Sequence, residues 1–224
     1  MKNHAVSMSS HTGLRRLTTP RAAALAGVVF ALLFGAVLIL IRTKMPEGVE
    51  GSAQWLTTRR GGIATATVLM PFAGISFLWF MGVVRDGLGP YEDRFFSTVF
   101  LGSGLLFLAM MFVSMSIAAG LVATNAAPDA ETIAFGKMIV LASTKTYAVR
   151  MAAVFMMSLA TIWLRTGLMP RWLVGISYFA ALALLLASDV SMWVTVMFPG
   201  WVLVVSGMLL ARAGLFEKLR DSSD

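Results

Sequence analysis

Six polar side chains in the second half of the sequence could do chemistry together, because their spacing places them on one face of a helix. They recur in steps of three and four, interrupted only by Val154, which is the repeat of an amphipathic helix. The six are Ser143, Tyr147, Arg150, Ser158, Thr161 and Arg165. The opposite side carries Val149, Met151, Phe155, Met156 and Leu159. The pattern predicts a helix that turns its polar face into a bundle and its apolar face to lipid.

Arg150 is the cation expected to lie deepest in the membrane. An isolated charge in hydrocarbon costs at least ~2.5–3.5 kcal/mol, so it needs a partner or a route to water. The only acid between Glu131 and Glu217 is Asp189, and we hypothesise an Arg150–Asp189 ion pair to which Tyr147 adds a hydrogen bond. Three interpretations stay open: a gate or ion-binding site, a structural clamp, or an arginine that reaches the headgroups while Asp189 lies in water.

Other chemistry is scarce in this chain. It has no cysteine, and its two histidines, His4 and His11, lie in the N-terminal tail. This argues against thiolate metal sites, a bis-histidine haem, an HExxH protease and a Ser–His protease. No pair of acids falls inside an apolar run, which disfavours a carboxylate proton relay. We therefore expect no cofactor, no metal and no enzymatic activity.

The elements that position the polar face are long apolar runs. Hydrophobic residues make up 58% of the 224 and charged residues only 13%, whereas soluble domains average about 25% charged. Six runs predict an all-α, polytopic transmembrane bundle of six helices. The expected spans are 22–41, 63–84, 96–123, 145–164, 172–187 and 192–211, between a flexible basic cytoplasmic tail at 1–21 and a charged cytoplasmic tail at 212–224. A signal peptide is the alternative for the first run, but the run is long and no clear cleavage site follows it.

The fourth span is defined by its two arginines. Only fourteen residues separate Arg150 from Arg165, which is about 21 Å of helix against a hydrocarbon core of ~30 Å. The span must therefore begin before Arg150, near Lys145 or Tyr147. The residues before it, 131–144, are expected to form an interfacial helix.

Charge outside the spans predicts the orientation. With the N-terminus inside, eleven Lys and Arg residues lie on the cytoplasmic side and six on the other. The excess favours both termini in the cytoplasm. The net charge of +7 is interpreted as anchoring to an anionic leaflet rather than as nucleic-acid binding, because the cations cluster at the ends of the apolar runs.

Small residues recur every fourth position in the first span, at Ala23, Gly27, Ala31 and Gly35. Such a stripe lets a second helix backbone approach closely. Packing within the chain, a dimer contact and chance are the three explanations. The loop RDGLGPYEDR at 85–94 could dock a cytoplasmic partner or act as a solvated turn, and its GLGP lacks the lysine of a nucleotide-binding loop.

Two stretches carry a resemblance. The segment RTGLMPRWLVGISYFAALALLLA at 165–187 resembles uncharacterised bacterial membrane proteins, the DUF4386-like family among them. The segment at 71–107 is similar to uncharacterised actinobacterial multi-pass proteins. The resemblance implies a bacterial plasma membrane setting and carries no known activity or catalytic residue.

Three functions are compatible with the sequence. A non-enzymatic accessory or scaffold component of the membrane is favoured, because nothing catalytic is present. A small transporter or channel for a solute, an ion or a lipid, using the polar face of the fourth span, is the alternative. An intramembrane enzyme is the weakest reading. The expected partners are the lipid bilayer and other membrane proteins, and the oligomeric state stays open.

Overall fold

The computed structural model describes residues 19–44, 52–88, 94–123, 130–187 and 192–221, and within these ranges all regular structure is helical. The elements are α1 (Thr19–Lys44), α2 (Ser52–Leu88), α3 (Arg94–Ala123), α4 (Ala130–Ala142), η2 (Ser143–Ala148), α5 (Val149–Thr166), α6 (Arg171–Ala187), η3 (Met192–Val196) and α7 (Met197–Asp221). Apolar sequence favours this outcome, because a helix satisfies its own backbone hydrogen bonds where water is absent.

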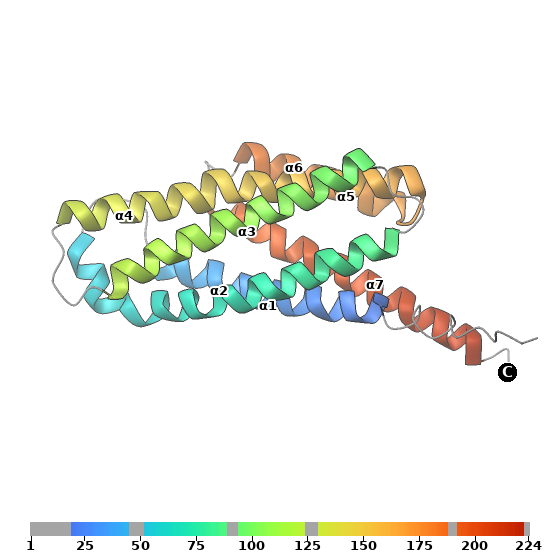
Figure 1. The fold of residues 1–224 in the computed structure, drawn as a ribbon, viewed down its shortest axis with the longest axis horizontal. Coiled ribbons are helices and arrows are strands. Elements are labelled where there is room, and N and C mark those ends of the chain that lie inside the picture. The colour runs from blue at the N-terminus through green and yellow to red at the C-terminus, as the bar shows by residue number, and fades with distance from the viewer. Residues whose placement is uncertain (1–18, 45–51, 89–93, 124–129, 188–191, 222–224) are drawn as a thin grey trace, which may run out of the picture.

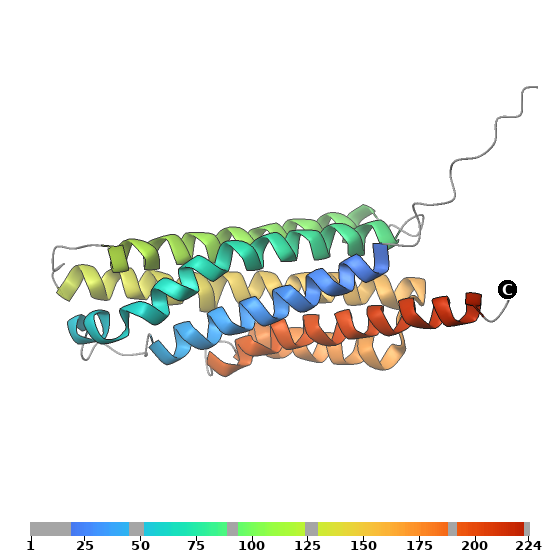
Figure 2. The same cartoon turned by 90° about the horizontal axis from the view of Figure 1, so that it is seen from below.

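Six helical runs form a closed ring. The main contacts connect α1 to α2, α2 to α3, α3 to α5, α5 to α6, α6 to α7, and α7 back to α1 (Figures 1 and 2). Five of the runs are long and apolar enough to cross a membrane, whereas α6, with 17 residues, is shorter. The predicted all-α bundle of six helices is therefore confirmed, with the features of a multi-pass membrane protein.

The fourth run is continuous. α4, the π-helical segment η2 and α5 follow one another without a break, and the Val149 N–H donates to the Thr144 carbonyl, five residues earlier. The segment expected to be a separate interfacial helix thus joins the expected fourth span in one rod. The rod ends at Gly167, whose φ of 67° lies in the left-handed region that favours glycine.

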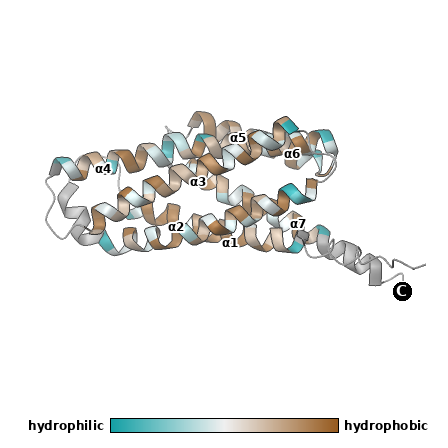
Figure 3. Cartoon of the chain, in the orientation of Figure 1, coloured by the Kyte–Doolittle hydropathy of each residue, from teal (hydrophilic) through white to brown (hydrophobic). Residues whose placement is uncertain are grey.

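One end of the bundle is rich in arginine. Each run contributes one arginine there, beside the starts of α1, α3 and α6 and the ends of α2 and α5, with α7 passing the same level (Figures 1 and 3). They are Arg21, Arg85, Arg94, Arg165, Arg171 and Arg212. The Arg165 guanidinium lies 4.7 Å from the centre of the Phe96 ring, so a cation–π contact ties α5 to α3. We call this end the arginine end.

The centre of the ring is filled by aromatic side chains. Rings from α1, α2, α3, α5 and α7 pack in stacked and edge-to-face pairs, with centroids 4.6 Å apart for Phe30–Phe77, 5.4 Å for Phe77–Phe107 and 5.0 Å for Phe107–Phe198. The buried set, which we call the aromatic core, is Phe30, Phe34, Phe77, Phe80, Phe100, Phe107, Phe155, Phe198 and Trp201. It holds the helices together at mid-height of the bundle.

Candidate functional site

The polar face of the fourth run is divided between the interior and the edge of the bundle, because Ser143 and Ser158 are buried. The side opposite it, with Val149, Phe155, Met156 and Leu159, is almost completely buried. On the polar side Tyr147 and Arg165 are exposed and Arg150 is half-buried. The predicted orientation of this helix was therefore wrong for its apolar side, which faces the bundle and not lipid, and for Tyr147 and Arg165, which are exposed. Its aromatic and methionine side chains pack against α3 and the aromatic core, where shape decides the fit, and this leaves the arginine-bearing side at the periphery.

Arg150 is positioned at the junction of the π-segment and α5. Its Nη1 donates to the carbonyl of Thr146 at 2.9 Å, so the side chain bends back toward the N-terminal end of its helix. A groove of about 500 Å³ opens beside it. The walls of the groove come from α3, η2 and α5, and are Leu106, Met110, Thr146, Tyr147, Arg150 and Met151. Of the predicted site residues, Arg150 and Tyr147 therefore share one groove.

Ser158 and Thr161 lie farther along the same helix and do not line the groove. The Ser158 hydroxyl donates to the Val154 carbonyl at 2.8 Å. Thr161 donates to the Met157 carbonyl at 2.8 Å, and its Oγ1 lies 2.6 Å from the Tyr178 hydroxyl of α6. Both hydroxyls bond carbonyls of their own helix, and the Thr161 hydroxyl also joins α5 to α6.

Asp189, the predicted partner of Arg150, lies outside the described residues, and the Arg150–Asp189 pair stays a prediction. A different cation makes a contact between distant segments. Arg42, at the end of α1, donates a hydrogen bond to the Thr195 hydroxyl of η3. The sequence had placed Arg42 among the loop cations, and no spacing rule connects it to a residue so distant in the chain.

The π-segment at Ser143–Ala148 was not predicted from the sequence. The Ser114 hydroxyl of α3 lies 3.0 Å from the Val140 carbonyl and 2.7 Å from the Thr144 hydroxyl, and all three groups are buried. Thr144 also donates to the Val140 carbonyl at 2.8 Å. A buried serine therefore lies opposite the widened helical turn, and π-helical turns occur often at functional sites.

The small-residue stripe of α1 faces the chain itself. Ala23, Gly27 and Ala31 are buried, and Gly35 is half-buried. A Cβ added to Gly27 would overlap the Ser206 Oγ of α7 and lie 2.8 Å from the Phe80 ring of α2, whereas one added to Gly35 would meet nothing within 4 Å. The stripe packs within the chain around Gly27, which is the first of the three explanations.

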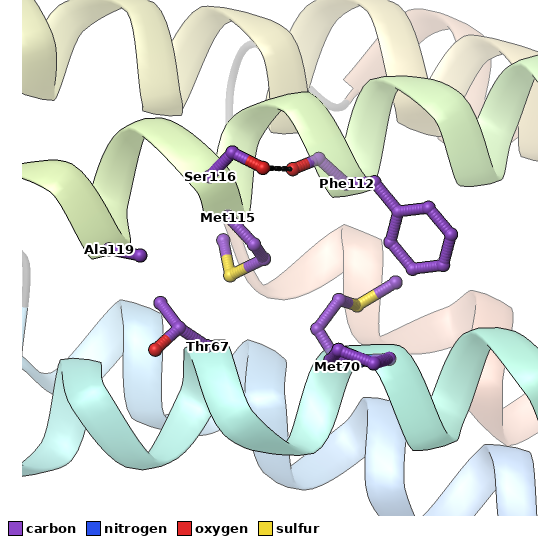
Figure 4. Close-up of a pocket in the computed structure, with 7 residues that line it drawn as sticks. Thr67, Met70, Phe112, Met115, Ser116 and Ala119 are labelled. Atoms are coloured by element: carbon purple, nitrogen blue, oxygen red, sulfur yellow. Dashed lines mark hydrogen bonds between the residues drawn. The ribbon is translucent and has the colours of Figure 1, made fainter.

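A second groove lies between α2 and α3 and holds about 250 Å³. Met70 and Thr67 approach it from α2, and Met115, Ser116 and Phe112 from α3 (Figure 4). Both hydroxyls are used inside their own helices, since Thr67 donates to the Ala64 carbonyl and Ser116 to the Phe112 carbonyl, each at 2.8 Å. The groove therefore presents an apolar surface without a charged group.

Within the part of the chain that the structure describes, no three His, Cys, Asp or Glu side chains lie close enough together to hold a metal ion. No protein family model matches the chain, and no curated protein or solved structure matches it either. The resemblance to DUF4386-like bacterial membrane proteins therefore remains a prediction. Function has to be argued from the geometry alone.

Proposed function

We propose that the protein is a non-enzymatic accessory or scaffold component of a bacterial plasma membrane, with both termini in the cytoplasm. The observation that carries the proposal is the aromatic core. A protein that conducts solute through its own centre needs a polar or open path there, and at this level of the bundle the space is occupied by packed rings.

The buried polar groups near the centre also support this function. The Trp201 indole N–H donates to the Ser177 hydroxyl at 2.8 Å, and Ser177 donates to the Leu173 carbonyl at 2.7 Å. Ser114 and Thr144 are bonded in the same way between α3 and the π-segment. These groups connect helices to one another and offer little to a passing solute.

The surface offers a place for a partner. The rod from Glu131 to Thr166 has 36 residues and is about 54 Å long, against a hydrocarbon core of ~30 Å. α4 contacts mainly α3 and α2, and it extends past the ends of α1, α6 and α7 (Figures 1 and 2). Phe135 and Met138 are each 67% exposed on it. Apolar side chains exposed on a projection of this kind suit contact with another membrane protein.

The orientation is supported by the arginine end. Six arginines, one from each helical run, lie at that end, and positively charged residues favour the cytoplasmic side. α1 begins there, and α7 runs past the same level to Asp221. The α4 projection would then face the outside of the cell.

Purification of the tagged full chain from bacterial membranes in mild detergent tests the proposal. We expect a membrane protein to co-purify in stoichiometric amount and to be lost when Phe135 and Met138 are both replaced by serine. The matched control replaces Phe179 and Leu182 of α6, which are also exposed, and should retain the partner. Recovery of the chain alone, with equal recovery of every variant, would contradict a scaffold role.

The second candidate is a small transporter for a solute, an ion or a lipid that uses the polar face of the fourth run. The π-segment next to Arg150 favours it, because such segments often accompany functional sites. Flux through liposomes containing the pure protein separates the two candidates. Saturable uptake that is abolished by Arg150→Gln would support transport and contradict a purely structural role.

A further inference from the structure

The groove beside Arg150 has the form of a lipid site. Its walls are apolar over most of their length, with Leu106 and Met110 from α3 facing Met151 from α5. Its volume of about 500 Å³ lies within the ~300–1,000 Å³ that is typical of pockets for single small ligands. It is too small for a partner helix and is open at the side of the bundle, where a hydrocarbon chain can enter from the bilayer.

The polar groups of the groove gather at one end. α3 and α5 run antiparallel, so Met110 and Thr146 lie toward the α4 side while Leu106 and Met151 lie toward the arginine end. The Arg150 guanidinium reaches back to the Thr146 carbonyl, and therefore lies at the α4 side of the groove. Tyr147, 59% exposed, also lines the groove and precedes Arg150 on the helix, so its backbone lies toward the same end. A molecule in this groove would meet charge at one end and hydrocarbon along the rest.

The depth of this polar end matches a headgroup. Arg150 precedes Arg165 by fifteen residues on one continuous helix, which places its Cα about 22 Å from the arginine end. The bent-back side chain carries the guanidinium several ångströms farther, to the far boundary of a ~30 Å hydrocarbon layer. No acidic residue among those described lines the groove.

We propose that this groove binds one anionic phospholipid, whose phosphate pairs with Arg150 and accepts a hydrogen bond from Tyr147 while one acyl chain lies against Leu106, Met110 and Met151. Guanidinium groups suit this role because their planar N–H donors match a phosphate in geometry and charge. The lipid would fill the seam between α3 and α5 and strengthen a contact made mainly by apolar side chains.

Native mass spectrometry of the full-length protein tests the site. The protein would be released from mild detergent in the presence of equimolar phosphatidylglycerol and phosphatidylcholine with matched chains. We expect the wild type to retain the anionic lipid about fivefold better, which is the effect of one cation at a membrane surface. Arg150→Gln should remove the preference and Arg150→Lys should keep it. Arg85→Gln, which changes an exposed arginine at the opposite end, should also keep it.

The acyl part of the site is tested separately. Leu106→Trp adds bulk to the groove wall and should lower the binding of both lipids while Arg150 is still present. Equal retention of both lipids by the wild type, or an unchanged preference in Arg150→Gln, would overturn the proposal. Displacement of the lipid by inorganic phosphate, with no effect of Leu106→Trp, would show a plain anion site instead. If Arg150→Gln does not fold, Arg150→Lys and Leu106→Trp still decide the outcome.

Discussion

Ser114 and Thr144 are joined by hydroxyl oxygens 2.7 Å apart, in the buried contact between α3 and the π-segment. Both oxygens also lie within hydrogen-bond distance of the Val140 carbonyl, at 3.0 and 2.8 Å. The π turn shifts the backbone pairing by one residue, as the bond from the Val149 N–H to the Thr144 carbonyl shows. The Ser114 and Thr144 hydroxyls thus lie against the Val140 carbonyl, one helical turn before Thr144 and beside the shifted backbone hydrogen bond.

Ser114→Ala should lower the free energy of unfolding by about 0.5–1.5 kcal/mol, because one buried hydrogen-bonded hydroxyl is lost while Thr144 still bonds Val140. Unfolding of the detergent-solubilised protein by heat or by a denaturing detergent measures the loss. Ser116→Ala is the control, since the Ser116 hydroxyl is exposed and bonds only within its own helix. Equal losses of unfolding free energy in the two variants would show that the buried Ser114–Thr144 contact stabilises the protein no more than an exposed hydroxyl does.

Phe77→Ala should cost about 3–5 kcal/mol of stability, the usual cost of removing a buried aromatic side chain and leaving a cavity. Its ring has five neighbours in the aromatic core, which are Phe30, Phe80, Phe107, Phe155 and Phe198, with centroids between 4.6 and 6.3 Å away. Phe179→Ala on α6 should stay within about 0.5 kcal/mol of the wild type, because the Phe179 side chain is 72% exposed. The same unfolding assay compares the two, and similar midpoints would contradict a packed centre.

Gly27→Ala should destabilise the bundle by about 1–3 kcal/mol, since its Cβ would overlap both the Ser206 hydroxyl and the Phe80 ring. Gly35→Ala, in the same stripe, should be neutral or up to about 1 kcal/mol stabilising, because open space surrounds it and alanine favours a helix. The double variant Gly27→Ala, Ser206→Ala should recover part of the loss. The thermal unfolding midpoints of the variants measure these differences. A lowered midpoint for Gly35→Ala with an unchanged midpoint for Gly27→Ala would contradict the close packing around Gly27.

The proposed orientation can be tested with single thiols, because the chain has no cysteine of its own. Gly61 and Gly87 are exposed and lie toward opposite ends of α2, and a Cβ at either position meets nothing within 4 Å. A membrane-impermeant maleimide added to intact spheroplasts should label Gly61→Cys. It should label Gly87→Cys only after the membrane is opened. The reverse pattern would place both termini outside.

The sequence was sufficient for the fold class but not for the direction in which each helix faces. Long charge-free runs predict helices because the backbone must bond to itself in lipid. Lipid and protein interior are almost equally apolar, so hydropathy does not tell Phe155, which is fully buried, from Phe179, which is largely exposed. The small residues around Gly27 did point correctly to a close contact, because close approach depends on size and not on polarity.

The candidate site was predictable only in part. Arg150 stood out because a charge is rare in an apolar helix, and it does line a groove with Tyr147. Leu106 and Met110 of that groove come from a helix that nothing in the sequence pairs with the fourth run. The π turn bonds to Ser114, which lies on a different helix from the turn. Both features arise from contacts between segments distant in the chain.

The closed ring has a consequence for how the protein is made. α1 leaves the ribosome before the other described helices, yet one of its two neighbours in the ring is α7, which follows all of them in the chain. The surface around Gly27 therefore meets Ser206 only after the helices between α1 and α7 have been made. Until then the nascent chain is an open arc of helices whose two edges are uncovered. A chain truncated before α7 would remain in that state, a substrate for insertion chaperones and membrane proteases.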